Sequence, residues 1–120
     1  MKPENIILTG YLSYEGYIGL LRGVSAIMDL VNNEHTLLMG AFEAVSLGTP
    51  LIVSDWPILR KYFPLGTAYV PNTAEGICEG VRRMQDEHTQ LRRDILLLRE
   101  QLQVEWMHKF TELQHLLSEG

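Results

Sequence analysis

The feature that most constrains the fold of this 120-residue chain is a set of short aliphatic runs that alternate with helical patterns. The clearest run, residues 51–54, reads Leu-Ile-Val-Ser and follows a Gly-Thr-Pro turn directly. A strand without polar alternation is covered on both faces, as in parallel sheets whose connections are helices. The pattern therefore predicts an α/β fold.

Four such runs predict four strands, at residues 6–8, 26–31, 51–54 and 67–70. Helical patterns fill the segments between them: residues 14–23 after a Ser13 cap, 36–47 ended by Gly48, 56–63 opened by Pro57, and a long pattern that begins near Asn72 and Glu75 and runs to about Leu117. We therefore predict a partial Rossmann-like parallel sheet of about four strands, with flanking helices and a long C-terminal helical tail.

The character of the chain changes near residue 85, because residues 86–120 contain no proline and no strand pattern. Apolar residues recur there at helical spacing: Leu91, Ile95, Leu98, Leu102, Trp106, Phe110, Leu113 and Leu117. We divide the chain into an α/β domain, residues 1–84, and a helical extension, residues 85–120. The stripe must pack on something. We expect its own sheet, with a partner domain or chain as the alternative.

Charge and cysteine content exclude several classes of protein. The net charge of −5 favours neither nucleic acid nor an anionic membrane surface. The single cysteine, Cys78, excludes an internal disulfide, and its helical pattern predicts a buried small side chain. No apolar run is long enough to span a bilayer, and residues 1–5 lack the core of a signal peptide. We predict a cytoplasmic protein, and a parent enzyme at the inner face of a membrane remains an alternative.

Glu43 lies in the middle of the predicted helix 36–47, on the side away from the sheet. The side toward the sheet is apolar, with Leu37, Leu38, Ala41, Ala44 and Val45. Thr36, Gly40 and Leu47 share the side of Glu43. Glycine inside a helix costs roughly 1 kcal/mol relative to alanine, so Gly40 suggests that some group approaches the backbone closely. The alternative is an ordinary surface acid beside a tolerated glycine.

The start of this helix falls at the carboxyl end of a strand, where open parallel sheets bind ligands. Free N–H groups of His35, Thr36 and Leu37 would favour an anion, phosphate above all. The Glu43 carboxylate can accept hydrogen bonds from two hydroxyl groups of a ribose. One elongated ligand, with phosphate at the helix start and a ribose at Glu43, would fit both features.

The stretch "FEAVSLGTPLIVSD", residues 42–55, resembles the Glu-Ala-x-x-x-Gly-x-Pro-strand-Ser/Thr-Asp signature of the retaining glycosyltransferases of family 4, which have the two-domain GT-B fold. The resemblance covers residues 4 to about 117, and includes "NIILTGYLSYEGYIGLLRGVSAIMDLV", "TAYVPNTAEGICEGVRRM" and a closing segment with a tryptophan, "VEWMHKFTELQHLL". It implies the donor-binding half of an enzyme that transfers a sugar, with retention, from a nucleoside diphosphate sugar to an acceptor.

The resemblance also implies roles for particular residues. The family glutamate that matches Glu43 binds the ribose hydroxyls of the donor. The other glutamate of the motif falls on His35 here, with Glu34 one position earlier. Three readings stay open: His35 contacts the donor sugar, Glu34 does so with a shifted loop, or the sugar is held differently. A histidine that only bonds to backbone at the helix start is an equal alternative for His35.

Backbone groups complete the implied donor site. Those of Thr36, Leu37 and Leu38 would hold the distal phosphate and the sugar. Gly10, Tyr11 and Leu12 match the turn that lies against the base. The family needs no cofactor beyond its nucleotide-sugar substrate, and the histidines, acids and cysteine of this chain show no metal-ligand spacing.

The chain lacks the counterpart of the first strands of a family donor domain, with its glycine-rich turn and cation pair, and of the whole acceptor domain. We therefore expect a fragment, a truncated gene product or a subunit that is inactive alone as a transferase. Its unfinished sheet predicts an open edge and a homodimer. The alternatives are a non-catalytic α/β interaction module with a partner-binding tail and another nucleotide-sugar enzyme, such as an epimerase.

Overall fold

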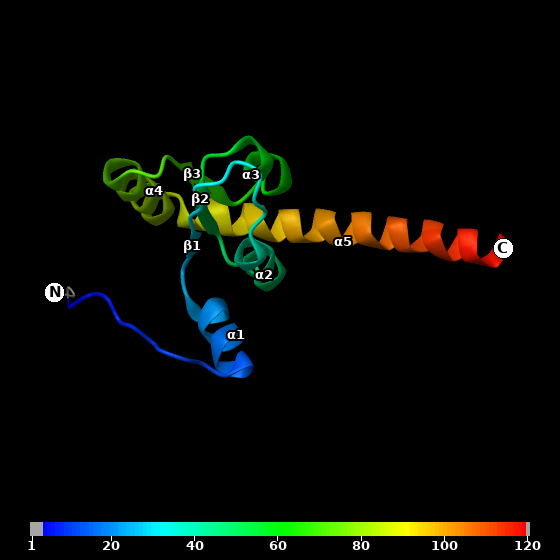
Figure 1. Ribbon diagram of the computed structural model, residues 1–120, viewed down its shortest axis with the longest axis horizontal. Helices are drawn as coiled ribbons and strands as arrows, with labels where there is room; N and C mark the ends of the chain where they lie inside the picture. The colour runs from blue at the N-terminus through cyan, green and yellow to red at the C-terminus, as the bar shows by residue number, and fades with distance from the viewer. Residues whose placement is uncertain (1–3, 120) are drawn as a thin grey trace.

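The computed structural model describes residues 4–119, which form one three-stranded parallel sheet with five helices (Figure 1). The elements in chain order are α1 (Tyr14–Gly23), β1 (Ile27–Asp29), α2 (Met39–Leu47), β2 (Leu51–Ser54), α3 (Pro57–Tyr62), β3 (Thr67–Val70), α4 (Ala74–Asp86) and α5 (His88–Glu119). The strands lie in the order β1-β2-β3, with Leu51 of β2 paired with Ile27 on one side and Thr67 on the other. The α/β prediction is confirmed, with three strands in place of four.

Helices cover both faces of the central strand. Leu51 and Val53 of β2 face one apolar cluster, formed with α2, α3 and α5. Ile52, between them, faces a second cluster formed with β3, α4 and the start of α5. All four residues of β2 are buried, which is the physical reason for its unbroken aliphatic sequence.

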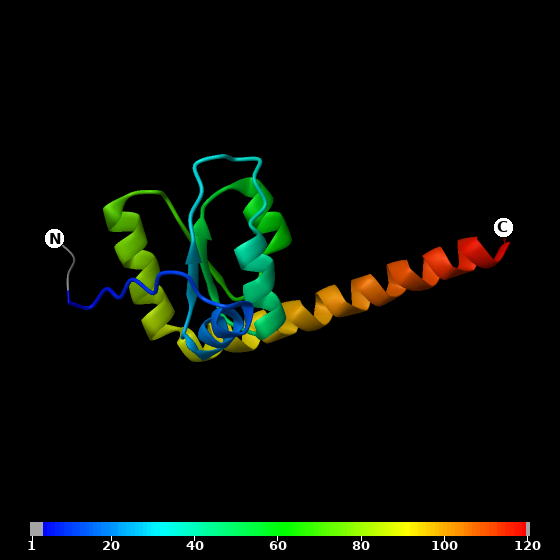
Figure 2. The ribbon, with the colours of Figure 1, turned by 60° about the horizontal axis from the view of Figure 1, so that its bottom comes forward.

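The predicted strand at residues 6–8 is wrong. These residues form an extended arm that runs from α1 away from the sheet (Figures 1 and 2), and Ile7 is 82 % exposed. A strand is stable only when it is paired along its edge and covered on its faces. In the described part of the chain α1 buries none of its residues, so it provides no cover for a fourth strand beside β1.

Several helix ends follow local sequence signals. The Ser13 side chain accepts a hydrogen bond from the Gly16 N–H, as predicted for a cap. Gly48, at φ 74°, ends α2 in the left-handed conformation that favours glycine. Helix α4 differs from expectation, because the side chain that caps it belongs to Thr73, which accepts from the Gly76 N–H.

The predicted burial of Cys78 is also wrong, because its side chain is exposed on α4. The face of α4 toward the sheet carries Gly76, Gly80 and Met84 instead. A Cβ on Gly80 would overlap Val70 Cγ1, so the glycine allows α4 to lie close against β3. Close packing on glycine, together with the apolar side chain of Met84, defines the buried face of this helix.

Helix α5 is a single 32-residue helix whose two halves have different surroundings. In the proximal half, residues 88–102, Leu91, Ile95 and Leu98 are buried against the body. The distal half, residues 103–119, projects into solvent (Figures 1 and 2), and Trp106 is 62 % exposed. The expectation that the stripe packs on its own sheet is confirmed for the proximal half and wrong for the distal half. Within residues 4–119, no helix has the length and apolar content to cross a membrane.

Candidate functional site

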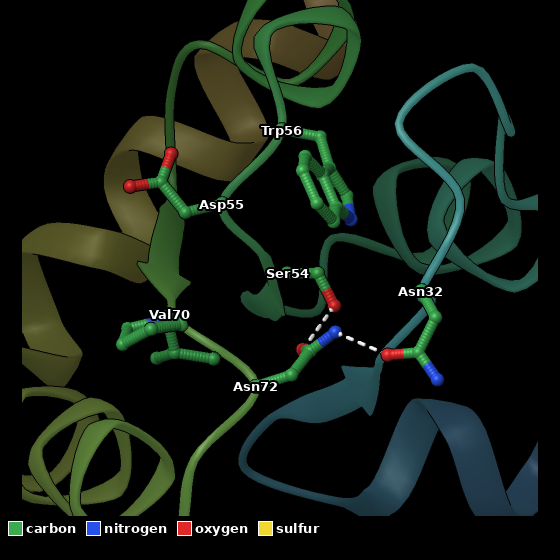
Figure 3. A pocket seen from close by; sticks show the side chains of 7 residues that line it. Asn32, Ser54, Asp55, Trp56, Val70 and Asn72 are labelled. Atoms are coloured by element: carbon green, nitrogen blue, oxygen red, sulfur yellow. Dashed lines mark hydrogen bonds between the residues drawn. The ribbon is translucent and has the colours of Figure 1, made fainter.

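Polar residues from the loops after all three strands meet at the carboxyl edge of the sheet and line a pocket of about 480 Å³ (Figure 3). Asn32 follows β1, Ser54 ends β2, and Asn72 follows β3. The remaining lining residues are Asp55, Trp56, Val70 and Pro71. This edge is where parallel sheets bind ligands.

A connected set of hydrogen bonds forms the floor of this pocket. Ser54 Oγ accepts from the Val31 N–H at 2.8 Å and donates to Asn72 Oδ1 at 2.6 Å. Asn72 Nδ2 donates to the Val31 carbonyl and to Asn32 Oδ1, both at 2.9 Å. Trp56 Nε1 donates to the same Val31 carbonyl at 2.8 Å. The main effect of the network is to fix the three strand ends together, because these polar groups are already paired with one another.

Asp55 turns out of this network and pairs with Arg60 on α3. Its carboxylate accepts from Arg60 Nε at 2.6 Å and from Nη2 at 3.1 Å, and the guanidinium lies 4.3 Å from the centroid of the Tyr69 ring. The hydrogen bond from Arg60 lowers the pKa of Asp55, so the pair stays charged at neutral pH. The expectation that Asp55 caps α3 is wrong, because Trp56 occupies the cap position without a side-chain bond.

A second polar group, the Glu43 group, lies between α1 and α2 and consists of Glu43 and Tyr17. The Tyr17 hydroxyl lies against the Glu43 carboxylate: desolvation and then this contact raise the pKa of Tyr17. Within residues 4–119, Glu43 Oε2 is buried and has no hydrogen-bond partner. A buried carboxylate oxygen without a donor is unfavourable. Glu43 is therefore neither a core residue nor an ordinary surface acid, and a ligand can reach its free oxygen only where α1 and α2 separate.

The close approach expected at Gly40 is made by the protein itself. A Cβ on Gly40 would lie 2.8 Å from Oδ2 of Asp29, the last residue of β1. Burial raises the pKa of Asp29. Glycine at this position leaves room for the Asp29 carboxylate beside the first turn of α2.

The start of α2 differs from the prediction by one turn. The helix begins at Met39 rather than Thr36, because Asn33 forms a competing turn. Its side chain accepts from the His35 N–H at 2.9 Å and its carbonyl accepts from the Thr36 N–H at 3.3 Å. These two N–H groups are therefore not free for a phosphate. The free N–H groups expected at a helix start belong instead to Met39 and Gly40.

Of the predicted apolar face of α2, Leu38, Ala41, Ala44 and Val45 are buried, whereas Leu37 is partly exposed. Leu37 precedes the helix and so does not follow its periodicity. Leu38 occupies the cap position, where no described side chain caps the helix.

His35 and Glu34 lie together in the exposed loop before α2. His35 Nε2 lies 3.5 Å from Glu34 Oε1, and both side chains are mostly exposed. They lie eight and nine positions before Glu43, on the loop side of the helix start. Either side chain is accessible to a ligand at the start of α2.

The turn at Gly10, Tyr11 and Leu12 lies at the base of the N-terminal arm, just before α1. Gly10 has φ 66°, and a Cβ there would meet no atom within 4 Å. Tyr11 is 97 % exposed, whereas Leu12 is half-buried. The turn leads through Ser13 into α1, whose Tyr17 contacts Glu43.

No protein-family model, curated protein or solved structure matches this chain. The geometry of the Glu43 group therefore carries the functional argument. Among residues 4–119, no group of three histidine, cysteine or acidic side chains is arranged to hold a metal ion.

Sequence reasoning missed Tyr17, Asp29 and the network of Ser54, Asn72 and Asn32. A signal for the network was present, since a polar residue stands at or just after each of the three strands. The carboxyl ends of parallel strands meet at one edge, so these residues could have been grouped. The contact of Tyr17 with Glu43 had no such signal, because it depends on how α1 packs on α2.

Proposed function

We propose that the chain is the donor-binding part of a glycosyltransferase and binds a nucleoside diphosphate sugar between α1 and the start of α2. The observation that carries the proposal is the buried, unpartnered Oε2 atom of Glu43. A ribose hydroxyl would supply the missing hydrogen bond once α1 moves away from α2 and exposes this oxygen. The "FEAVSLGTPLIVSD" signature supports the same role for this residue.

The start of α2 supports a position for the diphosphate. Gly40 precedes Glu43 by three residues, about 4.5 Å along the helix axis. The uncapped N–H groups of Met39 and Gly40 would attract the phosphates. Because Asp29 lies on the β1 side of this turn, the phosphates would approach from the side of the loop 35–38. His35 or Glu34 would then be the side chain nearest the sugar.

The chemistry expected of this part is binding rather than catalysis. Transfer from such a donor requires stabilisation of the diphosphate as charge develops on it. The start of α2 would contribute partial positive charge, but within residues 4–119 no lysine or arginine side chain pairs with Glu43. We therefore propose that sugar transfer needs cationic groups and an acceptor site supplied by another domain.

Isothermal titration calorimetry with UDP, GDP, ADP and their sugars tests the proposal. We expect weak binding of one nucleotide family, and at least a tenfold loss in Glu43→Gln, which keeps the shape of the side chain but not its charge. Glu79→Gln, an exposed glutamate on α4, is the matched control and should leave binding unchanged. Absence of binding, or equal binding by Glu43→Gln, would contradict the proposal.

A second candidate function is favoured by the exposed stripe on the distal half of α5. An α/β module without catalytic activity could use this stripe to bind a partner. In that case Glu43→Gln would have no effect on nucleotide titrations, whereas substitutions in the stripe would abolish association.

A further inference from the structure

The distal half of α5 carries an apolar stripe that continues the buried stripe of the proximal half. Trp106, Phe110, Leu113, Leu116 and Leu117 are exposed and lie on one side of the helix. At 100° per residue they share a sector roughly a third of the circumference wide with Ile95 and Leu98, which are buried. The same face of one helix is therefore covered in its first half and uncovered in its second.

An apolar groove lies where the two halves meet. It has a volume of about 180 Å³ and runs between α2 and α5, with Phe42, Val45, Leu102 and Trp106 as its apolar walls. Trp106 belongs to both the groove and the exposed stripe. The uncovered apolar surface thus extends from the tip of α5 to the side of α2.

We infer that this surface binds a second copy of the chain, with the distal halves of two α5 helices packed antiparallel and the tip of each helix in the α2–α5 groove of the other copy. An exposed apolar stripe of this length on a helix is a surface for another helix. The antiparallel arrangement covers stripe and groove together, and it places the two α/β bodies at opposite ends of the helix pair.

The charged residues of the distal half select this direction of pairing. Lys109 lies within the apolar sector, whereas Glu105 and Glu112 lie along one border of it. Parallel pairing in register would bring Lys109 of one copy against Lys109 of the other, which is unfavourable. In an antiparallel pair whose centre lies between residues 110 and 111, each Lys109 lies beside Glu112 of the other copy.

The size of the interface predicts moderate affinity. The stripe between Leu102 and Leu117 is about 23 Å long at 1.5 Å per residue. Specific interfaces bury roughly 1,200–2,000 Å² in total, and a helix pair of about four turns lies at or below the lower limit. The two grooves at the ends add to it. We expect a dimer that dissociates on dilution.

Sedimentation equilibrium over about a hundredfold range of concentration tests the inference. The wild-type chain of 13.7 kDa should approach twice that mass at the highest concentration. Leu113→Glu, in the centre of the stripe, should weaken association at least tenfold. Val104→Glu makes the same change on the opposite side of the same helix, where Val104 is also exposed, and should have no effect.

A wild-type chain that is monomeric at every concentration would overturn the inference. So would a dimer that Leu113→Glu leaves intact, because pairing would then use another surface, such as the free edge of β1. Circular dichroism of both variants controls for folding. Nucleotide titration of the monomeric variant separates this result from the proposed donor binding, which does not depend on it.

Disulfide trapping tests the direction of pairing in a Cys78→Ser background. A chain with both Trp106→Cys and Leu116→Cys should form a cross-linked dimer, because Trp106 of one copy lies opposite Leu116 of the other in an antiparallel pair centred near residues 110 and 111. Within one helix they are about 15 Å apart, too far for a disulfide. Each single variant should stay uncross-linked. A dimer trapped by either single variant would contradict the antiparallel arrangement.

Discussion

The centre of the molecule and its two ends contain similar apolar sequences, but only the centre is covered. β2 and the proximal half of α5 are buried among α2, α3 and α4. The arm at residues 4–12 and the distal half of α5 extend from this centre (Figures 1 and 2). Most of their apolar side chains are exposed. An apolar pattern therefore predicts which face of an element will be buried, but not whether this chain supplies the cover.

The largest contrast between centre and end should appear along the stripe of α5. Ile95 is fully buried in the proximal half. Its substitution by alanine should lower the free energy of unfolding of the protein by about 3 kcal/mol. Leu113→Ala, on the same face of the distal half, should change it by less than about 0.5 kcal/mol.

Urea denaturation at a low concentration, at which the chain is monomeric, measures both variants. Comparable losses for Ile95→Ala and Leu113→Ala would mean that the distal half is also covered within one chain. The comparison between the two halves of α5 would then fail.

Two glycines with positive φ sharpen the comparison. Gly66, at φ 71°, leaves room for α5, and a Cβ there would lie 2.5 Å from the backbone nitrogen of Ile95. Gly66→Ala combines left-handed strain with this overlap and should cost about 2–4 kcal/mol. Gly10→Ala carries only the strain, on an arm that contributes little to the core, and should cost at most about 1 kcal/mol. Thermal unfolding of the two variants checks which substitution lowers the stability more. A larger loss of stability for Gly10→Ala than for Gly66→Ala would contradict the prediction.

The smallest effect is expected from the carboxylate of Asp29, on the β1 side of the molecule. Burial raises its pKa above the ordinary value of 3.8, so the folded state binds the proton more tightly than the unfolded state. Its contribution to stability is therefore complete below pH 3.8 and is lost as the pH rises through the folded pKa. Asp29→Asn, which removes the charge, should be more stable than wild type at neutral pH and equal to it in acid.

Asp55→Asn is the control for this pH dependence. The hydrogen bond from Arg60 lowers the pKa of Asp55, so its stabilisation is present above the ordinary pKa and is lost as the pH falls through the folded pKa. Both side chains of this pair are about half exposed, so the effect should be small and of opposite sign. Unfolding free energies measured between acid and neutral pH would contradict the argument if both variants shifted in the same direction.

The sequence predicted well those elements for which the pattern of the element itself and the turn residues at its ends indicate the same structure. For β2 and β3 the aliphatic runs coincide with turn residues at their ends, and the observed strands match the expected ranges. Pro57 begins α3 and Gly48 ends α2 for reasons that lie within a few residues of the chain.

The failures share a non-local or competing cause. Residues 6–8 have a strand pattern, but pairing requires an edge and a cover that α1 does not provide. The start of α2 moved because the Asn33 side chain and carbonyl bind the His35 and Thr36 N–H groups, a competition that asparagine commonly offers the backbone.

For the candidate site, the sequence singled out Glu43 and placed the start of α2 three residues too early, and it did not give the surroundings of either. The helical periodicity placed Glu43 away from the core face of its helix. The burial of its Oε2 atom results from the packing of α1 against α2. Gly40 was expected to admit a ligand, and the group beside it is Asp29. A helical wheel gives the direction of a side chain, whereas its partner depends on the tertiary fold.

The spatial order of the strands repeats their order in the chain, β1-β2-β3. During synthesis each strand and its helix can therefore dock as they leave the ribosome, without waiting for a distant segment to insert between them. One face of the sheet is an exception, because Ile95 and Leu98 complete the cluster around β2 and α3. That face stays open on the nascent chain until the proximal half of α5 emerges, which makes this interval the period of greatest exposure to chaperones and to aggregation.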